Sequence, residues 1–350
     1  MTCPRPFLAL KASRRWLLAM AACLLVGQGN VAGEAFRPDP SGERNEAEGR
    51  KDVVLFWNVE NLFDCRHDTL KNDYDFLPEG SHRWTRRRYW HKLDDVSRTL
   101  AAVAEEEGQW PSVVGLCEVE NDTVLHDLTR RSTLRRAGYE YVMTESGDER
   151  GVDVALLYQP ERFRLLGYHA VRVPSLQHGF HPTRDILCVS GQLPAGDTLH
   201  VVVVHLPSRA GYHMGSGRHR KLAVRTLRHT VDSLAGKSVL VMGDFNSEPR
   251  DPLFRQLCPP LRSLLPQQKR ELRKAQGTYF FQGQWGYLDH ILVSEEIFGK
   301  VRDGRARPLK YSFLLDEQGR PWRTFRGPSY AGGFSDHLPL KAVLCAEYPE

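Results

Sequence analysis

The chain has 350 residues, a formal net charge of +5, 41% hydrophobic residues and 26% charged residues. This ordinary globular composition excludes a collagen-like, a fully disordered or a polytopic membrane protein, and the length allows about two average domains or one large α/β domain. The excess of basic residues favours an anionic partner such as nucleic acid only if those residues belong to the folded part of the chain.

The first 33 residues have the composition of an export signal. They contain four basic and no acidic residues, an apolar run over 16–26, and a small-residue end at 31–33. The apolar run is too short to span a membrane, and basic, apolar and small-residue regions in this order are typical of a signal peptide. We therefore predict a signal peptide over 1–33 and export to the periplasm or the extracellular space. A lipoprotein anchored at Cys23, an uncleaved N-terminal anchor and a disordered tail are the weaker alternatives.

Removal of this segment changes the charge and the cysteine count. The mature chain keeps 44 Lys and Arg against 43 Asp and Glu, so its net charge is +1. Its cysteines show no CxxC spacing, and an odd number of them cannot all pair within one chain. Those in apolar strand-like runs are expected to be buried thiols, although an oxidising compartment permits one disulfide. The five are Cys65, Cys117, Cys188, Cys258 and Cys345.

The mature chain begins with a polar stretch and continues as one α/β domain. Residues 34–50 are polar and charged, which predicts a flexible leader before a domain over 51–350. Apolar residues at helical spacing predict helices over 84–107 and 219–234, whereas 250–285 and 300–335 are rich in Pro and Gly and predict loops. Short β-branched runs between them predict strands buried on both faces. These runs are 53–57, 112–117, 152–158, 199–204, 238–242, 288–293 and 340–345.

Carboxylate, amide and imidazole side chains stand at the ends of six of these runs. One polar residue after a strand indicates only a turn, but six such sets of Asp, Glu, Asn and His predict a site. Oxygen-rich sets of this kind suit Mg²⁺, Mn²⁺ or Ca²⁺, whereas no His or Cys spacing supplies the usual zinc ligands. The chain also lacks a Walker-type loop, a GxGxxG turn and a Gly-x-Ser-x-Gly elbow. The six sets are Asn58-Val59-Glu60-Asn61, Glu118-Val119-Glu120, His205-Leu206-Pro207-Ser208, Gly243-Asp244-Phe245-Asn246, Leu288-Asp289-His290 and Ser335-Asp336-His337.

In this order and at these distances, the six motifs resemble those of the endonuclease/exonuclease/phosphatase superfamily, which has the deoxyribonuclease I-like fold. The resemblance covers residues 52–347, and the chain looks like exported bacterial members of the family. It implies an α/β (α+β) fold, a four-layered sandwich of two packed mixed β-sheets flanked by helices. It also implies hydrolysis of phosphate esters with Mg²⁺, with Mn²⁺ or Ca²⁺ as alternatives, by one or by two metal ions.

The resemblance also assigns the metal site and the catalytic residues. Glu118 would be the main metal ligand, with Glu60 and Asp336 as further acidic ligands. The resemblance further assigns residues that would activate the attacking water, contact the phosphate and lie near the leaving group. Asp244 would orient or deprotonate the attacking water, Asn58 and Asn246 would position the metal site and the phosphate, His337 held by Asp289 would stabilise charge, and His205 would lie near the leaving group, with Ser208 and Arg209 touching phosphate.

The resemblance indicates the class of reaction but does not identify the substrate. We favour an exported endonuclease that acts on DNA or RNA. The near-neutral mature charge keeps open a phosphatase or phosphodiesterase on an inositol phosphate, a lipid headgroup or another small phosphoester, and a non-catalytic binding module is a third reading. Two basic stretches, 83–92 and 209–228, suit nucleic acid. An amphipathic helix with Trp84 and Trp90 in the core and its charged residues in solvent explains the first more simply. No obligate protein partner and no transmembrane span in the mature chain are expected.

Overall fold

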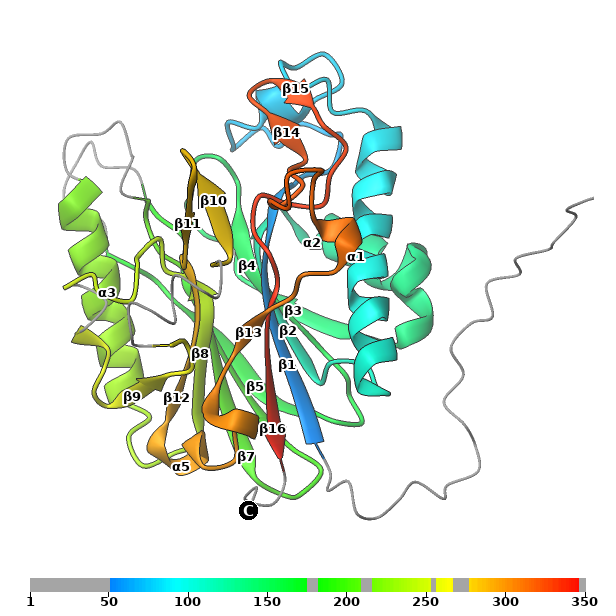
Figure 1. The fold of residues 1–350 in the computed structure, drawn as a ribbon. Helices are drawn as coiled ribbons and strands as arrows, with labels where there is room; N and C mark the ends of the chain where they lie inside the picture. Colours follow the sequence, from blue (N-terminus) through cyan, green and yellow to red (C-terminus); the bar gives the residue numbers. More distant parts are fainter. Residues whose placement is uncertain (1–50, 175–181, 209–215, 253–255, 267–276, 346–350) are drawn as a thin grey trace, which may run out of the picture. The chain divides into compact units, whose positions relative to one another are not determined.

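A computed structural model describes residues 51–174, 182–208, 216–252, 256–266 and 277–345, all of which lie in one compact unit (Figure 1). The predicted signal peptide, the leader, Cys23 and Arg209 lie outside the described residues. None of the helices in the described ranges combines the length and the hydropathy that a bilayer crossing requires. All five cysteines of the mature chain are described and are free thiols.

Two six-stranded mixed sheets form the centre of the structure. All seven strands predicted from apolar runs are present, as β1, β2, β4, β7, β8, β12 and β16. The first sheet has the order β13 (Arg307–Pro308), β16 (Leu340–Cys345), β1 (Lys51–Leu62), β2 (Val113–Val119), β4 (Asp153–Tyr158), β3 (Glu140–Met143). The second has the order β5 (Arg164–Val171), β6 (Ile186–Gln192), β7 (Thr198–His205), β8 (Val239–Asp244), β12 (Asp289–Ser294), β9 (Leu261–Ser263).

Side-chain alternation along the strands builds the layers. In β1, Val54 and Phe56 face the core between the sheets, whereas Leu55 and Trp57 face helix α1 (Arg86–Glu107). In the second sheet, Val241 packs instead under helix α3 (Ser216–Asp232). Figure 1 shows the two helices on opposite outer faces. Burial on both faces explains why these strands are continuous apolar runs, and the predicted four-layered sandwich is confirmed.

The helices agree with their predicted positions. The missed strands are exposed or short, except for β6, which is largely buried but ends in the polar sequence Ser190-Gly191-Gln192. Gly108 ends α1 in the left-handed conformation (φ 66°), a common helix terminator. β5 escaped prediction because most of its residues are exposed at a sheet edge, so it has no apolar run. Where the structure describes the segments predicted as loops, their strands are short: β9, the hairpin β10 (Tyr279–Phe281) and β11 (Gln284–Gly286), β13, and the pair β14 (Phe325–Arg326) and β15 (Ser329–Tyr330). The short helices are α2 (Asp122–His126), α5 (Glu295–Phe298), η1 (Tyr74–Phe76), η2 (Asp127–Arg131), η3 (Thr133–Ala137), η5 (Arg302–Gly304) and η6 (Ser312–Leu314).

Candidate functional site

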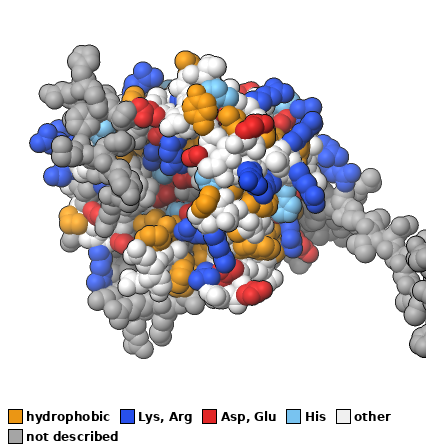
Figure 2. All heavy atoms as spheres, turned by 90° about the horizontal axis from the view of Figure 1, so that it is seen from above, with side chains coloured by type: hydrophobic (Ala, Val, Ile, Leu, Met, Phe, Trp, Pro, Cys, Tyr) orange, Lys and Arg blue, Asp and Glu red, His pale blue; other side chains and the backbone are white. Residues whose placement is uncertain are grey.

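The strand directions bring the predicted site residues to one end of the sandwich. β1 runs parallel to β2, and β7 runs parallel to β8, so the carboxyl ends of each pair meet. In the second sheet His205 is the register partner of Asp244, and Asp244 is also the partner of Asp289, with which antiparallel β12 begins. Figure 2 looks onto this end of the molecule, where Asp, Glu and His side chains lie between groups of Lys and Arg.

The backbone is strained at the points where these strands end. Glu60, Asn61, Glu118 and Asn246 have positive φ angles of 50°, 53°, 62° and 47°. The register between β1 and β2 is also interrupted after Asn58. A non-glycine residue in this region costs on the order of 1–3 kcal/mol, and such residues gather where a side chain must be aimed against backbone preference. Four of the seven non-glycine residues with positive φ in the described part of the chain therefore lie at these strand ends.

Gly243, which precedes Asp244, is required by the close approach of β7. A Cβ atom at Gly243 would lie 2.2 Å from the backbone oxygen of Val204, which cannot move without disturbing the sheet. We expect Gly243→Ala to lower the free energy of unfolding by about 1–3 kcal/mol and to displace Asp244. Gly115→Ala is the matched control, because its Cβ would meet only the side chain of Met242. Urea unfolding that shows a smaller loss for Gly243→Ala than for Gly115→Ala would contradict this role.

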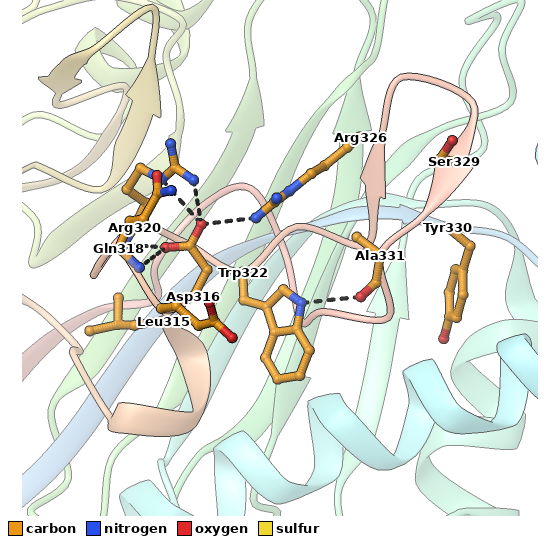
Figure 3. Close-up of a pocket in the computed structure, with 10 residues that line it drawn as sticks. Leu315, Asp316, Gln318, Arg320, Trp322, Arg326, Ser329, Tyr330 and Ala331 are labelled. Carbon is orange, nitrogen blue, oxygen red and sulfur yellow. Dashed lines mark hydrogen bonds and ion pairs between the residues drawn. The ribbon is translucent and has the colours of Figure 1, made fainter.

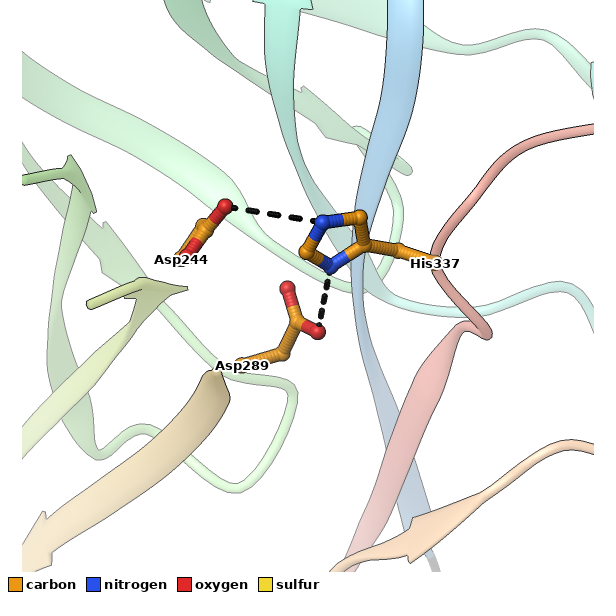
Figure 4. A group of neighbouring side chains, drawn as sticks. All are labelled: Asp244, Asp289 and His337. Carbon is orange, nitrogen blue, oxygen red and sulfur yellow. Dashed lines mark hydrogen bonds and ion pairs between the residues drawn. The ribbon is translucent and has the colours of Figure 1, made fainter. Parts of the chain in front are cut away.

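Asp244, Asp289 and His337 form a buried group (Figure 4). His337 Nδ1 lies 2.7 Å from Asp289 Oδ2, and Nε2 lies 3.8 Å from Asp244 Oδ2. Although burial opposes a charged ring, the carboxylates of Asp289 and Asp336 raise the pKa of His337 well above its ordinary value. Burial raises the pKa of Asp244 to about 7. The group thus places a cationic imidazole beside a carboxyl group that can exchange a proton near neutral pH.

Asn58 joins this group to Glu118. Its Nδ2 donates to Asp244 Oδ2 at 3.1 Å and to Glu118 Oε1 at 3.4 Å, while its Oδ1 accepts from the Glu60 backbone N–H at 3.0 Å. The other Glu118 oxygen accepts from the Asn61 backbone N–H at 2.9 Å. Ser335 Oγ donates to the Asn58 backbone oxygen at 2.7 Å and fixes the last motif to β1. The motifs that contain Asn58, Glu118, Asp244 and Ser335 are therefore in direct contact.

The carboxylates of this site fit a divalent cation. Burial raises the pKa of Asp336 as well as that of Asp244, and Glu118 is a further neighbouring acid. Asp289 Oδ1 is buried and has no hydrogen-bond partner in the described part of the chain. One ligand atom each from Asp244, Asp289 and His337 lies within 4.8 Å of the others. Carboxylate oxygens gathered in this way are the donors that Mg²⁺ or Mn²⁺ prefers.

Glu60 lies in the same region, but its oxygens face the backbone of the segment before the Ser-Asp-His motif. They accept from the backbone N–H groups of Thr324 at 2.6 Å and of Phe325 at 3.4 Å. Burial and the nearby Asp336 raise the pKa of Glu60 to about 7. These contacts give Glu60 a positioning role, and its predicted role as a metal ligand stays a prediction.

The leaving-group and phosphate candidates lie at the ends of β7 and β8. His205 Nε2 is 3.8 Å from Asp244 Oδ2, its Nδ1 has no hydrogen-bond partner among the described residues, and burial lowers its pKa well below the ordinary value. Asn246 donates from its side chain to the Leu206 backbone oxygen at 3.0 Å and from its backbone to Asp244 at 2.8 Å. Ser208 is exposed beside them. The structure thus gathers the described catalytic and metal-ligand candidates, and Ser208 follows His205 by three residues.

Sequence reasoning missed three basic residues that hold or flank the site. Buried Lys92 donates to Thr324 Oγ1 and to the Phe334 backbone oxygen. Its side chain lies on the same helix face as Val96, a spacing that marks it as buried. Within the stretch 209–228, the described Arg220 donates to backbone oxygens of both site loops, at Pro207 and Asn246.

Arg150 is the third missed residue, and it flanks Glu118. Its Nη2 lies 3.8 Å from Glu118 Oε2 and donates to the Asn61 side-chain oxygen at 2.9 Å. Its neighbour Asp153 opens β4, a position from which it could bond either to the site or to a turn. Asp153 bonds the Thr144 hydroxyl and the Ser146 backbone N–H, which is the turn role. Trp84 in the stretch 83–92 is fully buried, so the structural reading of that stretch holds for it.

Comparison with known proteins gives one family and a set of similar folds. The model of the Endonuclease/Exonuclease/phosphatase family matches residues 53–345. TDP2 of D. rerio, solved with a single-stranded DNA product, has a TM-score of 0.54 at 17% identity, over 84% of this chain and 98% of that one. A mannosyl-6-phosphatase of Bacteroides thetaiotaomicron gives 0.52 at 16%, over 83% and 98%. A conserved protein of unknown function from Enterococcus faecalis gives 0.53 at 17%, over 84% and 99%. No curated protein sequence matches the chain significantly.

Proposed function

The chain belongs to the Endonuclease/Exonuclease/phosphatase family, and on this premise we propose that it is an exported, divalent-metal-dependent phosphodiesterase that acts on DNA or RNA. The observation that carries the proposal is the buried contact chain from Glu118 through Asn58 and Asp244 to His337. It joins a candidate metal ligand, a proton acceptor and a cationic phosphate contact in one place. Export rests on the predicted signal peptide over 1–33.

Glu118 and Asp336 are the residues that would hold the metal, with Asn58 keeping Glu118 in place. A bound divalent ion would neutralise phosphate charge and stabilise the oxyanion as bonds change. The hydrogen bond from Asn58 to Glu118 and the backbone N–H of Asn61 orient the carboxylate before any ion binds. The half-buried Asp336 lies next to His337 in the chain and 3.6 Å from the Arg323 guanidinium.

Asp244 is the proposed general base. Its Oδ1 is held by the Asn246 backbone N–H, while Oδ2 faces Asn58, His205 and His337. A carboxyl group whose pKa lies near neutrality is well matched to accept a proton from water. His337, fixed through Nδ1 by Asp289, would present Nε2–H to the phosphate and stabilise the developing negative charge. His205, which burial keeps neutral, would lie on the leaving-group side.

The second candidate function is hydrolysis of a small phosphoester. The +1 charge of the mature chain favours it, because a dedicated nucleic-acid binder is commonly strongly basic. The fold is also shared by a mannosyl-6-phosphatase at 16% identity, a likeness that concerns the fold alone. The two functions differ in the group attached to the reacting phosphate, which is a nucleic-acid strand in the first and a small molecule in the second.

An assay on residues 34–350 tests the proposed function. We expect plasmid DNA or RNA to be cut, and bis-p-nitrophenyl phosphate to be hydrolysed, with Mg²⁺ or Mn²⁺ and not with EDTA, because Glu118 and Asp336 need a cation between them and the phosphate. Hydrolysis of small esters without cleavage of nucleic acid would replace the first function by the second. Inactivity on all substrates, together with no metal binding by calorimetry, would indicate that the chain is a non-catalytic binding module. N-terminal sequencing of exported protein tests the signal peptide separately, and an intact Met1 would refute it.

A further inference from the structure

A cavity lined by arginine opens beside the catalytic residues. Its volume is about 420 Å³, and hairpin β10–β11 and the segment 316–326 line it. A neighbouring cavity of about 560 Å³, whose lining residues Figure 3 shows, shares Asp316, Arg320 and Arg326 with it, and we treat the two together as one groove. None of the residues that line the groove is among the proposed catalytic or metal-binding residues. Its charged side chains are Asp316, Glu317, Arg320, Arg323 and Arg326.

Arg323 connects this groove to the reaction centre. Its Nη2 lies 3.6 Å from Asp336 Oδ2 and donates to the Tyr279 hydroxyl at 3.2 Å. The Tyr279 ring lies 4.7 Å from the His337 ring between centroids. Through Arg323 and Tyr279 the groove is therefore in contact with the side chains of Asp336 and His337.

Asp316 holds the other two arginines in place. Its Oδ2 accepts from Arg320 Nη2 at 2.8 Å, from Arg320 Nε at 3.1 Å and from Arg326 Nη2 at 3.0 Å (Figure 3). Its Oδ1 accepts from the backbone N–H groups of Gln318 and Arg320, both at 3.0 Å. Asp316 is thus saturated with donors, and it brings two guanidinium groups together before any ligand binds, which lowers the entropy cost of binding.

The charge balance of the cavity near the site favours an anion. Three arginines and a single carboxylate, that of Asp316, line it, and Glu317 adds one further carboxylate in the neighbouring cavity. Arg326 uses one nitrogen for Asp316, its other guanidinium nitrogens have no hydrogen-bond partner in the described ranges, and 58% of its side chain is exposed. Guanidinium groups bind phosphate through paired N–H donors that match the phosphate oxygens.

We infer that the groove binds a second phosphate group of the substrate, next to the phosphate that is hydrolysed. The inference rests on the proposed function for the identity of the reacting phosphate. The second phosphate is either the neighbouring phosphate of a nucleic-acid strand or the second phosphate of a small bisphosphate ester. In either case the substrate carries two phosphate groups, and Arg326 is the residue that binds the second one.

Calorimetry with ligand pairs that differ by one phosphate tests this inference. The protein is residues 34–350 carrying Asp244→Asn, with Mg²⁺, so that bound ligands are not turned over. The first pair is a thymidine dinucleotide with and without a 5′-phosphate, and the second is a hexose bisphosphate and the corresponding monophosphate. We expect the added phosphate to tighten binding about tenfold or more in at least one pair, because a charge-assisted contact has this strength. The pair that responds identifies the source of the phosphate.

The variant Arg326→Ala is expected to remove most of that difference, and Arg326→Lys to restore part of it. Arg307→Ala is the matched control, since Arg307 is also exposed and ion-paired, to Asp303 four residues away, and lies outside the groove. Equal binding within both pairs, binding of none of the ligands, or a difference that persists in Arg326→Ala would overturn the inference. Failure to hydrolyse bis-p-nitrophenyl phosphate with intact discrimination would instead overturn only the proposed function.

Discussion

Replacement of Asp244 by Asn is expected to lower kcat by about 10²–10⁴-fold, the range contributed by a general base. The amide has the same shape but cannot accept the proton of the attacking water. Its NH₂ group would also face the Asn58 donor, which now lies 3.1 Å from Oδ2. KM is expected to change less than kcat, because Arg150, Arg323 and His337 retain their positive charges beside the phosphate. Initial rates on bis-p-nitrophenyl phosphate with Mg²⁺ measure both constants.

The loss must be separated from unfolding. Asp244 ends β8 within the buried second sheet, and an isosteric amide keeps that strand intact. Asp232→Asn is the matched control, because Asp232 lies on α3 in an exposed ion pair with Arg228. We expect circular dichroism and the urea midpoint of Asp244→Asn to match those of this control. A folded Asp244→Asn protein with the kcat of the control would show that Asp244 is not the base.

Replacement of Lys92 by Met is expected to lower the free energy of unfolding by about 2–5 kcal/mol, because it leaves two buried oxygen acceptors without their donor and removes the cation near Glu60. Lys92 is 1% exposed, and its ammonium group bonds Thr324 and the backbone of Phe334. Burial lowers the pKa of Lys92, while the nearby Glu60 opposes that shift. Met keeps most of the side-chain volume, so the expected loss comes from the missing charge and hydrogen bonds. Urea unfolding measures it.

The same variant is expected to reduce activity because Lys92 fixes the segment that carries Asp336 and His337. Its acceptor Phe334 precedes Ser335, whose hydroxyl accepts from the His337 backbone N–H at 3.0 Å. The double variant Lys92→Met/Glu60→Gln should recover part of the stability, since it removes the buried charge left without a partner. Lys51→Met, in a partly exposed ion pair with Glu107, is the control and should lose about 1 kcal/mol or less. Stability of Lys92→Met equal to that of this control would rule out the positioning network.

Local patterns predicted the strands that are buried on both faces, with the exception of β6, and the chemistry at the ends of the predicted strands. Val53 to Trp57 is apolar throughout because each face packs against another layer. The family resemblance then supplied the pairing of Asp289 with His337, which residues 48 positions apart do not reveal by spacing. The 2.7 Å contact between them agrees with that expectation.

The remaining features depend on long-range packing that a linear pattern does not carry. Lys92 looks like part of a solvated basic stretch, yet the segment 324–334 folds over it and supplies its acceptors. Arg220 likewise belongs to a helix with a charged sequence but holds the backbone of the site loops from within. The arginine groove forms only when Arg320, Arg323 and Arg326 fold against hairpin β10–β11. In each case tertiary contacts decide whether a basic residue is solvent-exposed or structural.

The most direct test of the central claim follows the oxygen atom of the attacking water. A single turnover of bis-p-nitrophenyl phosphate in water labelled with oxygen-18 separates attack at phosphorus from attack at carbon. Activation of water beside Asp244 predicts one labelled oxygen in p-nitrophenyl phosphate and none in p-nitrophenol, in a reaction that needs Mg²⁺ and is lost in Asp244→Asn. Label in p-nitrophenol, or hydrolysis at the same rate in EDTA, would contradict a metal-dependent phosphoesterase centre at these strand ends.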